Sequence, residues 1–123
     1  MIIDDDRCIG EALRDRIQAA GYETIVMTDG CSALATIALE SGRSPLDLVL
    51  LDLNMPGMDG MAVLRALHEK YPAIPVIMIS ATSEREAFAD AVRAGARDYL
   101  PKPIDYKLLE EKCRKALGEE SAY

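Results

Sequence analysis

Acidic side chains follow two apolar segments of this chain, where a carboxylate is costly to bury without a function. Asp4 and Asp5 come directly after Met1–Ile3, and Asp52 comes directly after Leu46–Leu51. Carboxylates that converge repel one another, and a cation or a proton must offset that repulsion. A site with a few hard oxygen ligands suits Mg²⁺, with Mn²⁺ as a plausible substitute. These residues predict a divalent-cation site, provided that the fold brings them together.

A hydroxyl and an amine stand at equivalent places farther along the chain. Ser80 ends the apolar run that begins with Val76–Ile79, and Lys102 follows Asp98–Leu100. A pocket that combines Mg²⁺, a carboxylate, a hydroxyl and a lysine has the parts that phosphoryl transfer needs, because that chemistry relies on positioning and charge neutralisation. A carboxylate can itself be the nucleophile, which would give an aspartyl phosphate.

The elements that must position these groups alternate regularly. Short runs rich in Ile, Val and Leu are typical of parallel strands covered on both faces. They are Met1–Ile3, Thr24–Met27, Leu46–Leu51, Val76–Ile79 and Asp98–Leu100. Between them, apolar residues recur at helical intervals, as in Ile9, Leu13 and Ile17. The pattern predicts an α/β domain with five strand–helix units.

The helix-boundary signals agree with this alternation. Capping signals precede the second, third and fourth predicted helices: Asp29-Gly30, Asp59-Gly60 and a capping box from Ser83 to Glu86. Glycines stand where helices should end, at Gly21, Gly42 and Gly95.

Helical crossovers between strands imply a parallel sheet with right-handed connections. Five strands are too few for a closed barrel, so we expect a flavodoxin-like (βα)₅ three-layer sandwich with strand order 2-1-3-4-5. Ligands bind such sheets beyond the carboxyl ends of the strands, where the strand order reverses. Asp4, Asp5 and Asp52 should converge there. The domain is predicted to span 1–118, with 119–123 a polar tail or a linker stub.

The composition excludes several classes of protein. The 123 residues are 50% hydrophobic, which argues against disorder, and no run reaches the about 20 apolar residues of a membrane span. The formal net charge of −7 disfavours direct binding of this domain to nucleic acid or to an anionic membrane. We therefore expect a cytoplasmic domain.

Four motifs carry a family resemblance. They are Ile-Ile-Asp-Asp-Asp at 2–6, Leu-Leu-Asp-Leu-Asn-Met-Pro-Gly-Met-Asp-Gly at 50–60, Ile-Ser-Ala at 79–81 and Ala-Gly-Ala-Arg-Asp-Tyr-Leu-Pro-Lys-Pro at 94–103. With these motifs in this order, the chain resembles a response-regulator receiver domain of the chemotaxis-regulator type, the phosphoacceptor module of two-component signalling. The match runs from Met1 to about Leu117.

The resemblance implies a role for each site residue. Asp52 matches the phosphoacceptor, which receives a phosphoryl group from a histidine kinase or a histidine phosphotransfer protein. Asp5 would ligate Mg²⁺ directly and Asp4 mostly through water, while Asn54 would offer its backbone carbonyl. Lys102 would pair with a phosphoryl oxygen.

The resemblance also implies a switch. Ser80 matches the hydroxyl that bonds a phosphoryl oxygen, Tyr99 matches the aromatic ring that turns inward, and the Lys102–Pro103 peptide is expected to be cis, which proline permits. The surface formed by the fourth helix, fifth strand and fifth helix would then change its binding to a downstream effector domain or protein. A homodimer through that surface is plausible. Turnover of an external substrate is not expected.

Three other functions compete with this interpretation. A pseudo-receiver would bind partners without phosphorylation, but the acidic pair, Asp52, Ser80 and Lys102 are all present. A phosphatase of the haloacid-dehalogenase type would carry its nucleophile after the first strand and would need a cap. A flavodoxin-like cofactor binder would need a Gly- or Ser/Thr-rich loop where Asp4–Asp6 stand, and these acids would repel a phosphate.

The remaining residues of chemical interest have ordinary interpretations. The cysteines Cys8, Cys31 and Cys113 are too dispersed for a disulfide framework or a zinc site and are expected to be reduced and buried. His68 is expected on the surface of the third helix.

Overall fold

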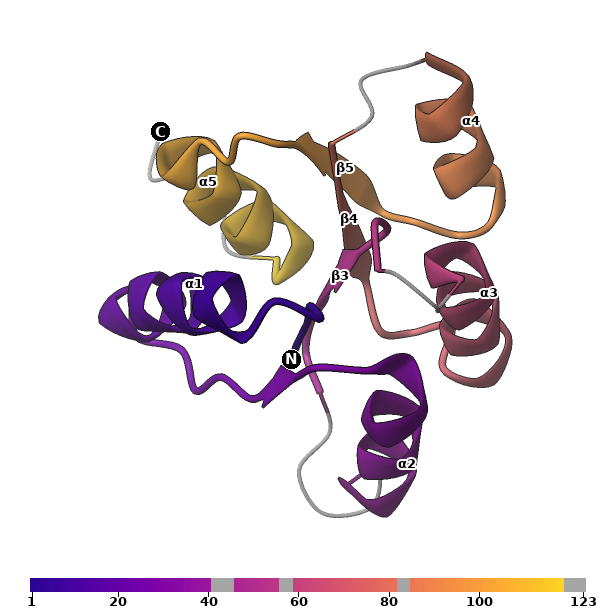
Figure 1. Ribbon diagram of the computed structural model, residues 1–123, viewed down its shortest axis with the longest axis horizontal. Helices are drawn as coiled ribbons and strands as arrows, with labels where there is room; N and C mark the ends of the chain where they lie inside the picture. Colours follow the sequence, from indigo (N-terminus) through magenta and orange to yellow (C-terminus); the bar gives the residue numbers. More distant parts are fainter. Residues whose placement is uncertain (41–45, 56–58, 82–84, 119–123) are drawn as a thin grey trace.

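A computed structural model describes residues 1–40, 46–55, 59–81 and 85–118. Strands and helices alternate along these ranges (Figure 1). The strands are β1 (Ile2–Ile3), β2 (Val26–Met27), β3 (Val49–Asp52), β4 (Val76–Ser80) and β5 (Asp98–Pro101). The helices are α1 (Arg7–Ala19), α2 (Gly30–Glu40), α3 (Gly60–Lys70), α4 (Arg85–Arg93) and α5 (Tyr106–Ala116).

The strands form one parallel sheet in the order β2-β1-β3-β4-β5. This confirms the predicted fold class and strand order. The strands β1, β2 and β3 begin later than predicted, because Met1, Thr24 and Leu46 lie outside them. The strands β3, β4 and β5 end one residue later than predicted, at Asp52, Ser80 and Pro101. Polar site residues are therefore held by the sheet itself.

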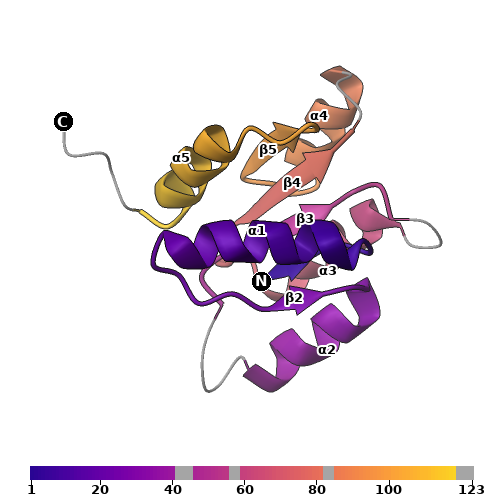
Figure 2. The same cartoon turned by 60° about the vertical axis from the view of Figure 1, so that its left-hand side comes forward.

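Helices cover both faces of the sheet, with α1 and α5 on one face and α2, α3 and α4 on the other (Figures 1 and 2). Successive strand side chains point to opposite faces, so neighbours in one strand join different cores. The α1/α5 core contains Ile2, Leu13, Leu50, Ile77, Ile79, Leu100, Leu109 and Cys113. The larger α2/α3/α4 core includes Ile3, Ile37, Leu51, Leu64, Leu67, Met78 and Ala91. This double burial explains why the strands lack polar alternation.

Aspartates cap four of the helices, and at the start of α2 Asp29 accepts the N–H of Ser32 at 2.7 Å, as predicted. Asp6 accepts hydrogen bonds from the N–H groups of Cys8 and Ile9 at the start of α1, and Asp59 and Asp105 cap α3 and α5. Each carboxylate satisfies backbone donors that lack a partner within the helix. Ser83, where the predicted capping box begins, and the predicted helix end at Gly42 lie outside the described residues.

All three cysteines are free, as predicted, but the prediction that they are buried is correct for only one of them. Cys113 is buried in the α1/α5 core, but Cys8 and Cys31 are exposed. Both stand in the first turn of a helix, at positions that are open to solvent, so the burial habit of cysteine does not apply there. His68 is exposed on α3, as predicted.

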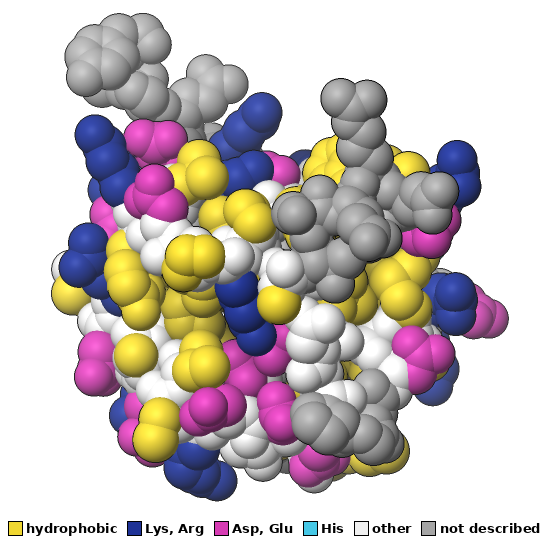
Figure 3. Space-filling model, turned by 45° about the horizontal axis from the view of Figure 1, so that its top comes forward, with side chains coloured by type: hydrophobic (Ala, Val, Ile, Leu, Met, Phe, Trp, Pro, Cys, Tyr) yellow, Lys and Arg dark blue, Asp and Glu magenta, His cyan; other side chains and the backbone are white. Residues whose placement is uncertain are grey.

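Charge is unevenly distributed over the molecule. Figure 3 shows one face on which acidic side chains gather near the centre beside a basic side chain, while other Lys and Arg side chains are scattered toward the edges. Among the described residues, no helix combines the length and apolar character that crossing a membrane demands.

The turn after α4 depends on a glycine. Gly95 has φ +108°, and a Cβ at this position would lie 2.3 Å from Cγ of His68 on α3. Gly21, after α1, has a similar φ of +101° but open space around it. The two positions thus share the backbone demand for glycine, and only Gly95 adds a steric demand.

We expect Gly95→Ala to reduce the free energy of unfolding by about 3 kcal/mol, because strain and overlap with His68 add together. Gly21→Ala, the matched control, should reduce it by only about 1 kcal/mol. Urea denaturation measures both values. Adding His68→Ala to Gly95→Ala should recover part of the difference between them, because it removes Cγ and Nδ1 of His68 but leaves a Cβ 2.8 Å from the added methyl group. Equal losses in the two single variants would contradict the role of the His68 contact.

Candidate functional site

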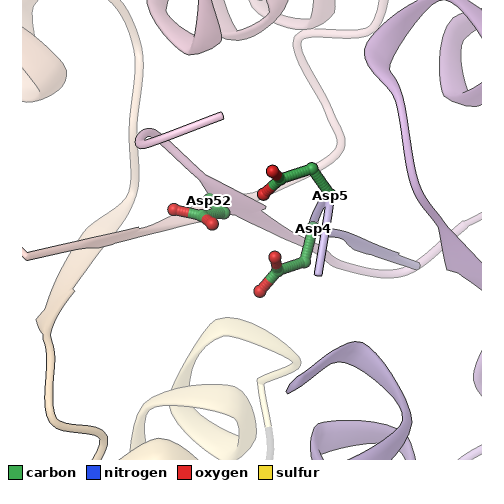
Figure 4. Close-up of side chains that lie close together, drawn as sticks. All are labelled: Asp4, Asp5 and Asp52. Carbon is green, nitrogen blue, oxygen red and sulfur yellow. The ribbon is translucent and has the colours of Figure 1, made fainter. Parts of the chain in front are cut away.

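The sheet register brings the first two acidic positions together. Ile3 of β1 pairs with Leu51 of β3, so the residues that follow, Asp4 and Asp52, come side by side at the carboxyl ends of neighbouring strands. Both are almost fully buried, each with an exposed fraction of 2%. Figure 4 shows the side chains of Asp4, Asp5 and Asp52 gathered at this end of the sheet. The predicted convergence is confirmed.

The three carboxylates form a donor set for a cation. Each offers an oxygen atom, and these atoms lie within 4.8 Å of one another. Asp4 and Asp52 are buried while Asp5 is exposed, so the cluster opens to solvent on one side. A hard divalent cation that keeps several waters fits such a set, because it needs few protein oxygens and an open side. The residues therefore fit the predicted Mg²⁺.

Burial disfavours the ionised form of Asp4 when no cation is bound. The pKa of Asp4 is raised to about 6, first by desolvation and also by the nearby charge of Asp52. The N–H of Asp6, which donates to Asp4 Oδ1 at 2.9 Å, and the charge of Lys102 act in the opposite direction but do not cancel the effect. Ionisation of Asp4 is therefore energetically unfavourable in this site.

Lys102 offsets part of this charge at Asp52. Its Nζ lies 3.2 Å from Asp52 Oδ2, and the lysine side chain is only 24% exposed. The other carboxylate oxygen of Asp52 accepts the backbone N–H of Asn54 at 2.9 Å. Asp52 is therefore held from two sides, by a cation that follows β5 and by the backbone that follows β3.

Ser80 and Lys102 are joined through the backbone. Ser80 is the last residue of β4, has an exposed fraction of 1%, and accepts the N–H of Lys102 on its carbonyl oxygen at 2.9 Å. The Lys102–Pro103 peptide is cis, as predicted. The hydroxyl-bearing strand end and the lysine thus reach the same edge of the sheet as the three acids.

Tyr99 lies in β5 and is half-buried against the α2/α3/α4 core. Its ring meets the ring of Phe88 on α4 edge to face, with centroids 5.5 Å apart. Phe88 is 45% exposed and Val92, one turn farther along α4, is 47% exposed. The predicted switch aromatic therefore contacts a helix that presents apolar side chains to solvent.

One contact of the site was not predicted from the sequence. The backbone of Asn54 was expected to matter, but its side chain also takes part: Asn54 Oδ1 accepts the N–H of Ala81 at 2.8 Å. Asn54 follows β3 and Ala81 follows β4, so the bond spans two strand ends. Its only sequence signal was an amide side chain two residues after Asp52.

Comparison with known proteins identifies the family of this chain. The family model for the response regulator receiver domain matches residues 1–114, which is nearly the whole chain. The chain belongs to the response regulator receiver domains. The family resemblance seen in the motifs is therefore confirmed.

Curated relatives are longer response regulators. The response regulator protein FleR of Pseudomonas aeruginosa is 37% identical over 120 residues, which cover 97% of this chain and 24% of FleR. The DNA-binding transcriptional regulator NtrC of Salmonella typhimurium is 38% identical over 104 residues, covering 85% of this chain and 21% of NtrC. The chain thus spans about a quarter of the length of these relatives.

Solved structures agree in fold. The receiver domain of NtrX from Brucella abortus superposes with a TM-score of 0.85 at 33% identity, covering 97% of this chain and 98% of that domain. A CheY-like receiver domain protein from Methanospirillum hungatei gives 0.84 at 28% identity, covering 96% and 91% of the two chains. The flavodoxin-like architecture is common to all three.

The raised pKa of Asp4 predicts how the free energy of unfolding depends on pH. A raised pKa means that the folded state binds the proton more tightly than the unfolded chain, so ionised Asp4 destabilises the fold above about pH 6, and this effect fades as the pH falls toward the ordinary value of 3.8. Without divalent cations, Asp4→Asn should raise the free energy of unfolding by about 1–2 kcal/mol at about pH 7.5. The gain should shrink steadily toward about pH 5.

Urea denaturation across this pH range measures the effect, with Asp5→Asn as the control because Asp5 is exposed. Asp5→Asn should give a smaller gain with a weaker pH dependence. A gain for Asp4→Asn that is the same at both ends of the range would contradict the assignment to charge.

Proposed function

We propose that this domain is the phosphoacceptor of a two-component phosphorelay and that Asp52 receives the phosphoryl group. The observation that supports this most directly is the placement of Asp52: buried at a strand end, beside two further carboxylates, with Lys102 on one oxygen. A lone acid in such a place would be a poor structural choice. The same position suits a nucleophile, because nearby groups can neutralise and orient its carboxylate.

Each residue of the site has a role in this proposal. Asn54 N–H and Lys102 Nζ orient the Asp52 carboxylate, so that one of its oxygens faces an incoming phosphorus. The carboxylate oxygen attacks, the bond from phosphorus to the donor breaks, and the donor leaves with that electron pair. Lys102 then pairs with a phosphoryl oxygen, and the Ser80 hydroxyl donates to another. These contacts compensate the charge of about −1.5 to −2 that phosphorylation adds.

Asp4, Asp5, Asp52 and the backbone carbonyl of Asn54 are the proposed ligands of Mg²⁺, with Mn²⁺ as a substitute. The bound cation supplies positive charge that offsets the carboxylates and the phosphoryl oxygens. The raised pKa of Asp4 fits this role, because a site strained by its own negative charge gains most from a cation.

Phosphorylation is proposed to act on the surface of α4, β5 and α5. Movement of Ser80 toward a phosphoryl group would free space for Tyr99, whose ring now contacts Phe88 on α4. Phe88 and Val92 are exposed apolar residues on that helix, so a small shift of the ring would alter a surface suited to binding. A homodimer through this surface is compatible with the proposal.

The proposed partners follow from the family. A histidine kinase or histidine phosphotransfer protein would supply the phosphoryl group in the cytoplasm. A downstream effector domain or protein would respond, as expected for a domain that spans about a quarter of its relatives. We propose no direct contact of these residues with nucleic acid or membrane, and no turnover of an external substrate beyond self-phosphorylation and dephosphorylation.

Acetyl phosphate with Mg²⁺ tests the proposal. Intact mass spectrometry should detect one phosphoryl adduct that is stable in acid and labile in base, as expected for an acyl phosphate. Asp52→Asn should abolish it, because an amide cannot serve as the nucleophile. Removal of Mg²⁺ with a chelator should also prevent its formation.

Asp6→Asn is the matched control, since Asp6 is a neighbouring acid that caps α1 and is not among the proposed ligands. It should retain the adduct. Absence of the adduct from the parent protein, together with failure to bind beryllofluoride, would favour an interaction module that works without phosphorylation. An undiminished adduct on Asp52→Asn would place the acceptor elsewhere.

A further inference from the structure

We infer that Asn54 is a positioning residue whose side chain holds the backbone N–H of Ala81 while Asp52 is unphosphorylated, and that phosphorylation releases this bond. The inference deepens the proposed function and, for its second half, rests on it. Asn54 thereby becomes a second connection, besides Ser80, between the state of Asp52 and the segment that leads into α4.

Two consecutive hydrogen bonds make the connection. Asn54 N–H donates to Asp52 Oδ1 at 2.9 Å, and Asn54 Oδ1 accepts from Ala81 N–H at 2.8 Å. Both distances lie within the usual range of N–H···O hydrogen bonds. Asn54 therefore donates a hydrogen bond to the Asp52 carboxylate with its backbone and accepts one from a neighbouring strand end with its side chain.

Ala81 lies where the chain leaves β4 toward α4. Ala81 directly follows Ser80, the last residue of β4, and α4 begins at Arg85. Ser80 is anchored in the sheet and its carbonyl oxygen is occupied by Lys102 N–H. The Asn54–Ala81 bond is thus the first constraint after the strand ends, at the point where the chain leaves the sheet toward α4 and Phe88.

Phosphorylation of Asp52 would weaken this arrangement from both ends. The carboxylate becomes an acyl phosphate, so the acceptor of Asn54 N–H loses its charge. At the same time anionic phosphoryl oxygens enter the site, and they are stronger acceptors than the neutral amide oxygen of Asn54. An inward movement of Ser80 would also carry Ala81 away from its present partner. All three changes favour release.

Amide hydrogen exchange, followed by NMR, tests the resting bond. In the metal-free parent protein the Ala81 amide should be protected, and Asn54→Ala should make it exchange about fivefold faster, the effect of losing one neutral hydrogen bond. Asn54→Asp retains an oxygen at the same place and should keep the protection. The amides of Leu53 and Lys102, which donate to strand carbonyls, are internal references and should not change.

Binding of beryllofluoride with Mg²⁺ tests the release. Because the parent must break the Asn54–Ala81 bond and Asn54→Ala has none to break, the variant should bind this phosphoryl mimic about fivefold more tightly. A residue that merely stabilised the fold would leave this affinity unchanged. Titration with Mg²⁺ alone measures the metal affinity of each protein, and the beryllofluoride affinities are compared at Mg²⁺ concentrations that saturate both.

The outcomes separate the inference from the proposed function. Unchanged exchange at Ala81 in Asn54→Ala overturns the resting bond, and equal or weaker binding of beryllofluoride by that variant overturns the release. If neither protein binds beryllofluoride, the proposed function fails and the release fails with it, whereas faster exchange in Asn54→Ala would still support the resting bond.

Discussion

Repulsion among carboxylates at one sheet edge is the interaction on which the rest of this domain depends. Asp4 and Asp52 are buried side by side, and Asp5 adds a third negative charge at the open side of the cluster. Nothing about folding alone favours such a cluster, as the raised pKa of Asp4 indicates. The fold tolerates it because β1 and β3 are fixed by pairing and by two cores, while Lys102 and backbone N–H groups offset part of the charge. A domain built in this way is poised to respond to any event that changes the charge at that edge.

The same edge is connected to the surface by short paths. Lys102 and Ser80 share a backbone hydrogen bond, so β4 and β5 meet the site as a unit. Tyr99 lies three residues before Lys102 and touches Phe88 on α4. Asn54 reaches Ala81, at the start of the segment that leads to the same helix. Two of these routes therefore end at α4, whose apolar side chains Phe88 and Val92 are exposed to solvent.

Much of this could be predicted from the sequence because the signals were local and redundant. Apolar runs of Val, Ile and Leu that end in Asp52 or Ser80 indicated both the strands and the polar residues at their ends. The alternation with helices implied a parallel sheet, and the strand order was the one expected for a flavodoxin-like fold. Strand boundaries were less accurate, since pairing with a neighbour decides how much of a strand is regular: β2 pairs only with the two-residue β1, and β3 pairs along its four residues with β4. Cys8 and Cys31 were misjudged because composition says nothing of which way a first-turn residue faces. The side-chain contact of Asn54 depends on the three-dimensional closeness of two strand ends, which no local pattern encodes.

The division of the apolar interior into two cores has a consequence for how such a domain can diverge. Leu50 and Leu51 are adjacent in the chain yet pack in different cores on opposite faces of the sheet. Substitutions in different cores share no direct partners, so their effects on stability should be nearly additive, whereas those within one core should be coupled. The packing on one face of the sheet can therefore change while the packing on the other face stays as it is. The sheet acts as a partition between two separately packed halves, with the charged edge common to both.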